Sequence, residues 1–91
     1  MEEAERLGLV NGVFPEESLQ DEAMTIARRL AQGPTIAYRY MKENLNRAVH
    51  GEMGECLDME AAHHIHCGKT RDHKDAVQAF VDKREPEFHG Q

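Results

Sequence analysis

Hydrophobic residues recur at intervals of three and four along most of the chain, which is the spacing that places side chains on one face of an α-helix. In one such series Leu19, Ala23, Ile26 and Leu30 follow one another at intervals of four, three and four. The pattern predicts an all-α fold with four principal helices. Three of them are expected near residues 17–32, 34–49 and 52–67, and the fourth between residues 70 and 86.

The last of these helices has sequence signals at both ends. Thr70 is placed to cap its first turn, and Pro86 is placed to stop it, because the residue before a proline is pushed out of the α region. Acidic Asp72 and Asp75 stand near its start and basic Lys83 near its end. This distribution of charge complements the helix macrodipole.

The helical spacing also selects the side chains that should face inward in the later helices. They are Ala37, Met41, Leu45 and Ala48; Met53, Leu57, Ala61, His64 and Ile65; and Ala76, Val77, Phe80 and Val81. The resulting core is marginal, because a chain of 91 residues without tryptophan buries little apolar area. We therefore expect a further apolar face that is covered by something outside these helices.

The beginning of the chain departs from the helical pattern. A short helical stretch at residues 2–7 precedes an extended apolar stretch at residues 9–14, which has the turn signal Asn11-Gly12 at its centre. No second strand is available to pair with this stretch. A self-sufficient helical domain has no use for it, whereas a segment of a larger fold does, so we expect the sequence to begin within a longer protein.

Three segments of the chain resemble the enoyl-CoA hydratase/isomerase (crotonase) superfamily. LGLVNGVFP at residues 7–15 resembles the segment where the family's chain leaves its catalytic core, and GPTIAYRYMKENLNRA at residues 33–48 resembles its Gly-Pro-x-x-Ala helix. DHKDAVQAFVDKREPEF at residues 72–88 resembles its C-terminal helix. The resemblance implies that residues 1–91 form one domain, the helical C-terminal region of a crotonase-like fold without its spiral ββα core.

The resemblance also implies what the parent protein does. It would be an enoyl-CoA hydratase-type lyase or isomerase acting on acyl-CoA thioesters, and these helices would mediate formation of a trimer or a dimer of trimers. The family's oxyanion-hole donors and catalytic carboxylates belong to the missing core, so we expect no catalytic residue here and no turnover by this chain alone. The residues do not distinguish hydration from isomerisation, hydrolysis, dehalogenation or decarboxylation, and they do not identify the acyl group.

Phe80 and Lys83 are the candidate binding residues. They lie three residues apart and would be neighbours on a helix surface. A flat ring beside an ammonium group can stack on an adenine and reach a phosphate, and the resemblance implies that this pair holds the adenine end of coenzyme A, often from a neighbouring subunit. The alternative is that Phe80 is a core residue and Lys83 only complements the helix C-terminus. Because coenzyme A is part of the substrate, no separate cofactor is expected.

Charge and composition argue against several other partners. The 17 acidic residues outnumber the 11 Lys and Arg residues and give a net charge of −6, whereas nucleic-acid backbones need clustered positive charge. No apolar run is long enough to span a membrane. Cys56 and Cys67 would lie roughly 16 Å apart on one helix, too far for a disulfide, and are expected to be free thiols in a reducing cytoplasm.

Cys56, Glu60, His63 and Cys67 share one face of the third principal helix and are candidate metal ligands. Four ligands along one straight helix cannot surround an ion, so a metal would need further ligands from elsewhere, and we expect no native metal site. Two alternative functions stay open. One is a free-standing helical interaction module without coenzyme A chemistry, and the other is a helical protein that binds a metal through these residues.

Overall fold

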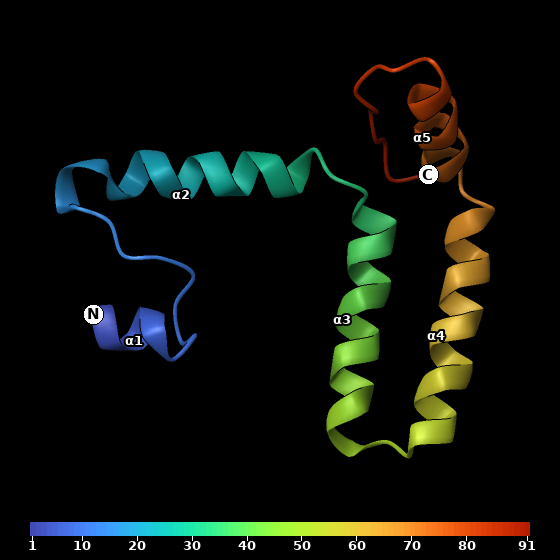
Figure 1. Cartoon of the computed structure of the whole chain (residues 1–91), viewed down its shortest axis with the longest axis horizontal. Helices are drawn as coiled ribbons and strands as arrows, with labels where there is room; N and C mark the ends of the chain where they lie inside the picture. The colour runs from blue at the N-terminus through green and yellow to red at the C-terminus, as the bar shows by residue number, and fades with distance from the viewer. The chain divides into compact units, whose positions relative to one another are not determined.

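The computed structural model describes all 91 residues and consists of five α-helices without a β-strand (Figure 1). The helices are α1 (Glu2–Arg6), α2 (Glu16–Ala31), α3 (Thr35–His50), α4 (Met53–Gly68) and α5 (Arg71–Val81). The all-α prediction is confirmed, and α2, α3 and α4 begin and end within one residue of the expected bounds. No helix combines the length and the apolar character that crossing a membrane requires. The chain divides into two compact units, Met1–Leu30 and Ala31–Gln91.

The first unit begins with α1, which ends in a turn at Gly8 with a φ of 73°. The amides of Gly8 and Leu9 donate to the carbonyl oxygens of Glu5 and Ala4, at 3.0 and 2.8 Å. This is the Schellman arrangement, in which a left-handed residue closes a helix and satisfies its last carbonyl groups. Residues 9–14, for which the sequence predicted an extended stretch, follow an irregular path with bends at residues 9–11 and pair with no strand.

The apolar series of α2 has little cover within the first unit. Ile26 is half-buried, whereas Leu19 and Leu30 are exposed. The helix begins just after Pro15, whose carbonyl oxygen accepts hydrogen bonds from the amides of Ser18 and Leu19, at 3.0 and 2.9 Å. The face that the spacing of α2 defines is therefore only partly covered.

The second unit is built on an antiparallel hairpin of α3 and α4 (Figure 1). The helices are joined at Gly51, whose amide donates to the carbonyl oxygen of Arg47 at 2.7 Å. In the contact between the two helices, the ring of Tyr40 stacks on that of His63, with centroids 4.2 Å apart and planes inclined by 20°. His63 Nδ1 also lies 2.6 Å from Asn44 Oδ1. Ring stacking and hydrogen bonding thus form the centre of the contact between the two helices.

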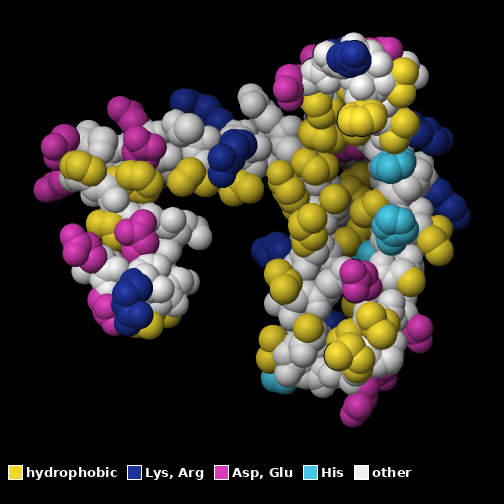
Figure 2. Space-filling view, in the orientation of Figure 1, with side chains coloured by type: hydrophobic (Ala, Val, Ile, Leu, Met, Phe, Trp, Pro, Cys, Tyr) yellow, Lys and Arg dark blue, Asp and Glu magenta, His cyan; other side chains and the backbone are white.

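The large side chains of the predicted inner faces of α3 and α4 are exposed, whereas Ala37 is half-buried. Tyr40 and Asn44 each precede a predicted inward residue, Met41 or Leu45, by one place, which on a helix is a rotation of about 100°. Leu45 is consequently 68% exposed. Figure 2 shows hydrophobic side chains along both helices of the hairpin. The exposed large members, which we call the outer apolar face, are Met41, Leu45, Val49, Met53, Leu57 and Ile65.

The expected inner face of α5 is half-buried at Ala76, but Val77, Phe80 and Val81 are exposed. The residues that α5 buries are Asp72, which is 3% exposed, and Ala79, which is fully buried, whereas Phe80 is 85% exposed. The difference arises because residues 82–91 fold back along α5 and cover the other side of the helix. We call this returning segment the C-terminal strap. Its covering action could not be read from the spacing of apolar residues alone.

Candidate functional site

The two candidate binding residues lie at the C-terminal end of α5, but only Phe80 is part of the helix. The helix ends at Val81, well before Pro86, and Asp82 is its C-terminal cap. Lys83 adopts a left-handed conformation with a φ of 55°. Its position is therefore set by the turn that closes α5, and the expectation that both residues share a helix surface is corrected accordingly.

This closing turn is a second Schellman motif. The amide of Lys83 donates to the carbonyl oxygen of Phe80 at 3.2 Å, and the amide of Arg84 donates to that of Ala79 at 3.0 Å. Left-handed geometry costs a residue with a side chain roughly 1–2 kcal/mol, and glycine normally takes this position. The motif brings the backbone of Lys83 directly against the helical turn that carries the Phe80 ring.

The side chains around this turn leave both candidates available to a ligand. Phe80 is exposed and is not a core residue of this unit. The carboxylate of Asp82 accepts a hydrogen bond from Gln78 at 3.0 Å and lies 3.6 Å from Arg84 Nε. None of the ion pairs in the structure involves Lys83. An exposed aromatic face and an unpaired ammonium group suit a planar base that carries phosphate.

The strap is fastened at the other end of α5 by Asp72. Its Oδ1 accepts the amide hydrogen of His89 at 2.7 Å, and its Oδ2 accepts that of Gly90 at 2.8 Å. The amide of Asp72 in turn donates to the carbonyl oxygen of Gln91 at 2.9 Å. The hydrogen bond from His89 is the main cause that lowers the pKa of the Asp72 carboxyl below its ordinary value of 3.8, although burial opposes the shift.

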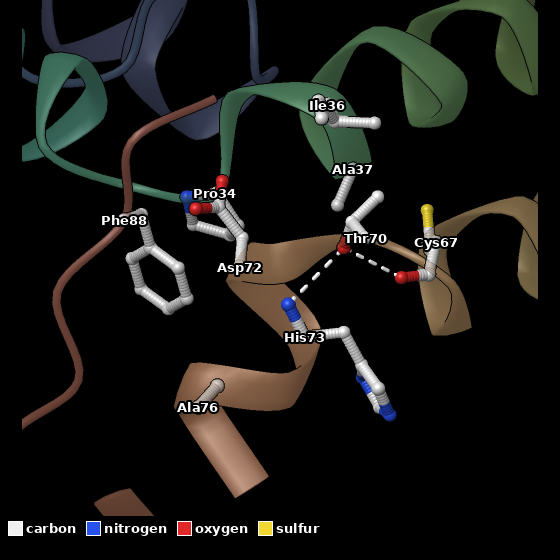
Figure 3. A pocket seen from close by; sticks show the side chains of 9 residues that line it. All are labelled: Pro34, Ile36, Ala37, Cys67, Thr70, Asp72, His73, Ala76 and Phe88. Carbon is white, nitrogen blue, oxygen red and sulfur yellow. Dashed lines mark hydrogen bonds between the residues drawn. The ribbon is translucent and has the colours of Figure 1, made fainter. Parts of the chain in front are cut away.

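Beside this fastening lies a small apolar cleft with a volume of about 130 Å³, seen in Figure 3. Phe88 of the strap lines it at one side, and Cys67 at the end of α4 lines it at the other. Thr70 Oγ1 accepts the amide hydrogen of His73 at 3.1 Å, which confirms Thr70 as the N-cap of α5. Because Phe88 forms one wall of this mainly apolar cleft, the strap contributes to the lining of the cleft.

The candidate metal ligands on α4 are not gathered into a site. Nowhere in the chain do three His, Cys, Asp or Glu side chains come together in a way that could hold a metal ion. His63 instead faces α3, with Nδ1 2.6 Å from Asn44 Oδ1 and Nε2 3.3 Å from Glu43 Oε2. His66 Nδ1 lies 3.4 Å from the Tyr40 hydroxyl. These histidines therefore belong to the contact between the two helices of the hairpin.

Comparison with known proteins places these observations in a wider context. A family model described as enoyl-CoA hydratase/isomerase matches residues 1–91. The 1,2-epoxyphenylacetyl-CoA isomerase of Escherichia coli (strain K12) is 34% identical over 89 residues, which is 98% of this chain and 34% of that enzyme. The short-chain-enoyl-CoA hydratase of Clostridium acetobutylicum is 34% identical over 86 residues, which is 94% of this chain and 33% of that enzyme.

Solved structures give the same likeness. A Mycobacterium abscessus crystal structure, assigned to the enoyl-CoA hydratase/isomerase type, matches 100% of this chain and 35% of that one, with 41% identity and a TM-score of 0.95. The chain thus spans about a third of the length of the relatives that it matches.

Proposed function

Because the chain belongs to the enoyl-CoA hydratase/isomerase family, we propose that it is the C-terminal helical segment of an enzyme that acts on acyl-CoA thioesters. Two observations support this role. The chain spans only a third of its relatives, and its α3–α4 hairpin turns large apolar side chains outward. The relatives from Escherichia coli and Clostridium acetobutylicum are both named for reactions of CoA thioesters. We also propose that this enzyme is cytoplasmic.

The contribution of this segment to the reaction is binding. In the family mechanism two backbone N–H groups polarise the thioester carbonyl and stabilise an enolate-like intermediate, while carboxylates move protons. The chain holds no nucleophile–base pair that could replace these groups. Phe80 would stack on the adenine and Lys83 would pair with a phosphate, both far from the reacting carbon. Such contacts are equally strong in the ground state and the transition state, so they lower KM without raising kcat.

The single observation that carries the coenzyme A contact is the combination of an exposed Phe80 ring with an unpaired Lys83 on the same closing turn. The outer apolar face of the hairpin supports a second role, in subunit association. Large exposed apolar patches mark surfaces that meet a partner. We propose that this face is covered in a trimer, or a dimer of trimers, of the complete enzyme.

The test begins with the coding sequence upstream of Met1, which should encode an oxyanion-hole loop and the rest of the core. In the longer protein, Phe80→Ala and Lys83→Ala should each raise KM for crotonyl-CoA about tenfold and leave kcat nearly unchanged. Stacking on a base contributes about 1–3 kcal/mol, and a hydrogen bond to a charged group contributes about 1.5–3 kcal/mol. Lys74→Ala removes an exposed lysine of α5 that forms no ion pair and serves as the control. Unchanged KM in both variants would refute the coenzyme A contact.

The chain of 91 residues should itself be silent. Its effect on the absorbance of the enoyl thioester band of crotonyl-CoA should equal that of buffer, since the groups that polarise the carbonyl are expected elsewhere. Clear turnover by this chain would contradict the proposal that the catalytic groups lie outside it and would favour a self-sufficient domain.

A further inference from the structure

We propose that Asp72 is a positioning residue for Lys83, acting through the C-terminal strap. The inference rests on the proposed function, because it assumes that Lys83 meets the nucleotide end of coenzyme A. Asp72 itself stands at the opposite end of α5 and contacts no ligand in this scheme. It fixes the segment that begins in the left-handed turn and ends beside its own carboxylate.

The backbone of Lys83 has a left-handed conformation, with a φ of 55°. Lys83 is the one residue other than glycine with a positive φ in the chain. Strained backbone of this kind persists only where surrounding contacts determine it, and it gathers at functional positions. A lysine at a position that favours glycine therefore requires contacts that hold the turn closed. It also indicates that the lysine side chain has a function.

The chain provides its own comparison for this position. The turn after α1 has the same two hydrogen bonds, and there the left-handed residue is Gly8, with a φ of 73°. Both turns need a left-handed residue for the same geometric reason. Only the turn after α5 uses a charged side chain for it, and only that turn continues into a strap that is fastened a second time.

The second fastening is at Asp72. Both carboxylate oxygens and the amide of Asp72 are hydrogen-bonded to residues 89–91 of the strap. Phe88 is half-buried and lines the adjacent cleft. Because α5 has 11 residues, the strap runs back over about 16 Å. With both of its ends held, the strap limits the conformations open to Lys83, which reduces the ordering that ligand binding requires.

The main test is the variant Asp72→Asn in the longer protein. An amide offers one acceptor oxygen where the carboxylate offers two, so one of the two strap amides loses its partner. We expect KM for crotonyl-CoA to rise about fivefold with unchanged kcat. KM for crotonyl-pantetheine, which lacks the nucleotide, should not change. A general structural defect would impair the reactions of both substrates alike.

Two further variants complete the test. In a double variant with Lys83→Ala, Asp72→Asn should add little, because the lysine that it positions is already gone. Gly90→Ala should loosen the strap while Asp72 keeps its carboxylate, since Gly90 has a φ of 72° and an added Cβ would approach Thr35 Oγ1 to 3.1 Å. It should show the same selective rise in KM for crotonyl-CoA, and it replaces Asp72→Asn as the test if that variant does not fold.

The outcomes separate this inference from the function on which it rests. If Lys83→Ala leaves KM for crotonyl-CoA unchanged, the contact between Lys83 and coenzyme A, on which this inference rests, is refuted. If Lys83→Ala raises KM but Asp72→Asn and Gly90→Ala do not, only the positioning role is refuted. Additive effects in the double variant, or equal effects on both substrates, would refute the positioning role as well.

Discussion

Lys83 occupies in the turn after α5 the position that Gly8 occupies in the turn after α1. Each has a left-handed backbone, with φ values of 55° and 73°, and each turn is closed by the same pair of backbone hydrogen bonds. The two turns differ in the side chain that the left-handed residue carries. The effect of that difference on the free energy of unfolding can be measured. A lysine that lowers stability indicates selection for ligand binding, whereas a lysine that raises stability indicates selection for the fold.

Lys83→Gly should stabilise the second unit by about 1 kcal/mol, because glycine adopts the left-handed region without steric penalty. Thermal unfolding followed by circular dichroism should show Tm raised by roughly 5 °C. Gly8→Lys is the matched control in the other Schellman turn and should lower Tm. A lower Tm for Lys83→Gly would mean that the lysine side chain stabilises the fold, which would remove the argument from strain.

Acid should release the strap. The folded-state pKa of Asp72 is lowered, so its contribution to stability is present above the ordinary pKa of 3.8 and is lost as the pH falls through the lowered value. The amide protons of His89 and Gly90 should report this protonation in an NMR titration, with a midpoint below 3.8. In Asp72→Asn the same amide signals should lose this transition. A midpoint above 3.8 in the unmodified chain would contradict the hydrogen-bonding scheme.

Thr70→Ala should destabilise α5 by about 1 kcal/mol, because the hydroxyl oxygen that accepts the His73 amide hydrogen is removed. Thr70→Ser keeps the oxygen and should retain most of the stability. Urea unfolding of the two variants side by side measures the difference. Equal stability of the serine and alanine variants would show that the cap contributes little.

The outer apolar face should drive self-association. Leu45→Glu and Ile65→Glu place charges on exposed apolar positions, so they should shift the sedimentation profile toward the monomer without loss of helix content. Asp58→Lys alters the charge of an exposed residue of α4 outside this face and should leave the profile unchanged. A stable monomer of the unmodified chain at micromolar concentration would argue against the association role.

The sequence was sufficient to locate the helices and the Thr70 cap, because local spacing and capping residues determine these features. It was not sufficient to predict where α5 ends. Pro86 marked the last possible boundary, but the Schellman turn at Lys83 ended the helix earlier, and a lysine gives no sign of left-handed geometry. The role of Phe80 and Lys83 in binding coenzyme A stays a prediction.

The inner faces were misjudged for a related reason. Periodicity finds the apolar side of a helix but does not reveal what covers it. Met41 and Leu45 were expected to face inward but are exposed, whereas Tyr40 and Asn44 contact His63 of α4. Asp72 was interpreted as a charge that complements the helix dipole. Its contacts with residues 17 and 18 positions further along the chain have no local sequence signature.

Stacked rings and hydrogen bonds lie at the centre of the contact between α3 and α4, and the large aliphatic side chains of the hairpin are exposed. Its two helices can therefore align before any partner arrives, since the bonds that align them are satisfied internally. A partner would then bind a surface that is already ordered, so association would require no further loss of backbone conformational entropy in the hairpin. Subunit association would then bring two preformed surfaces together as rigid bodies.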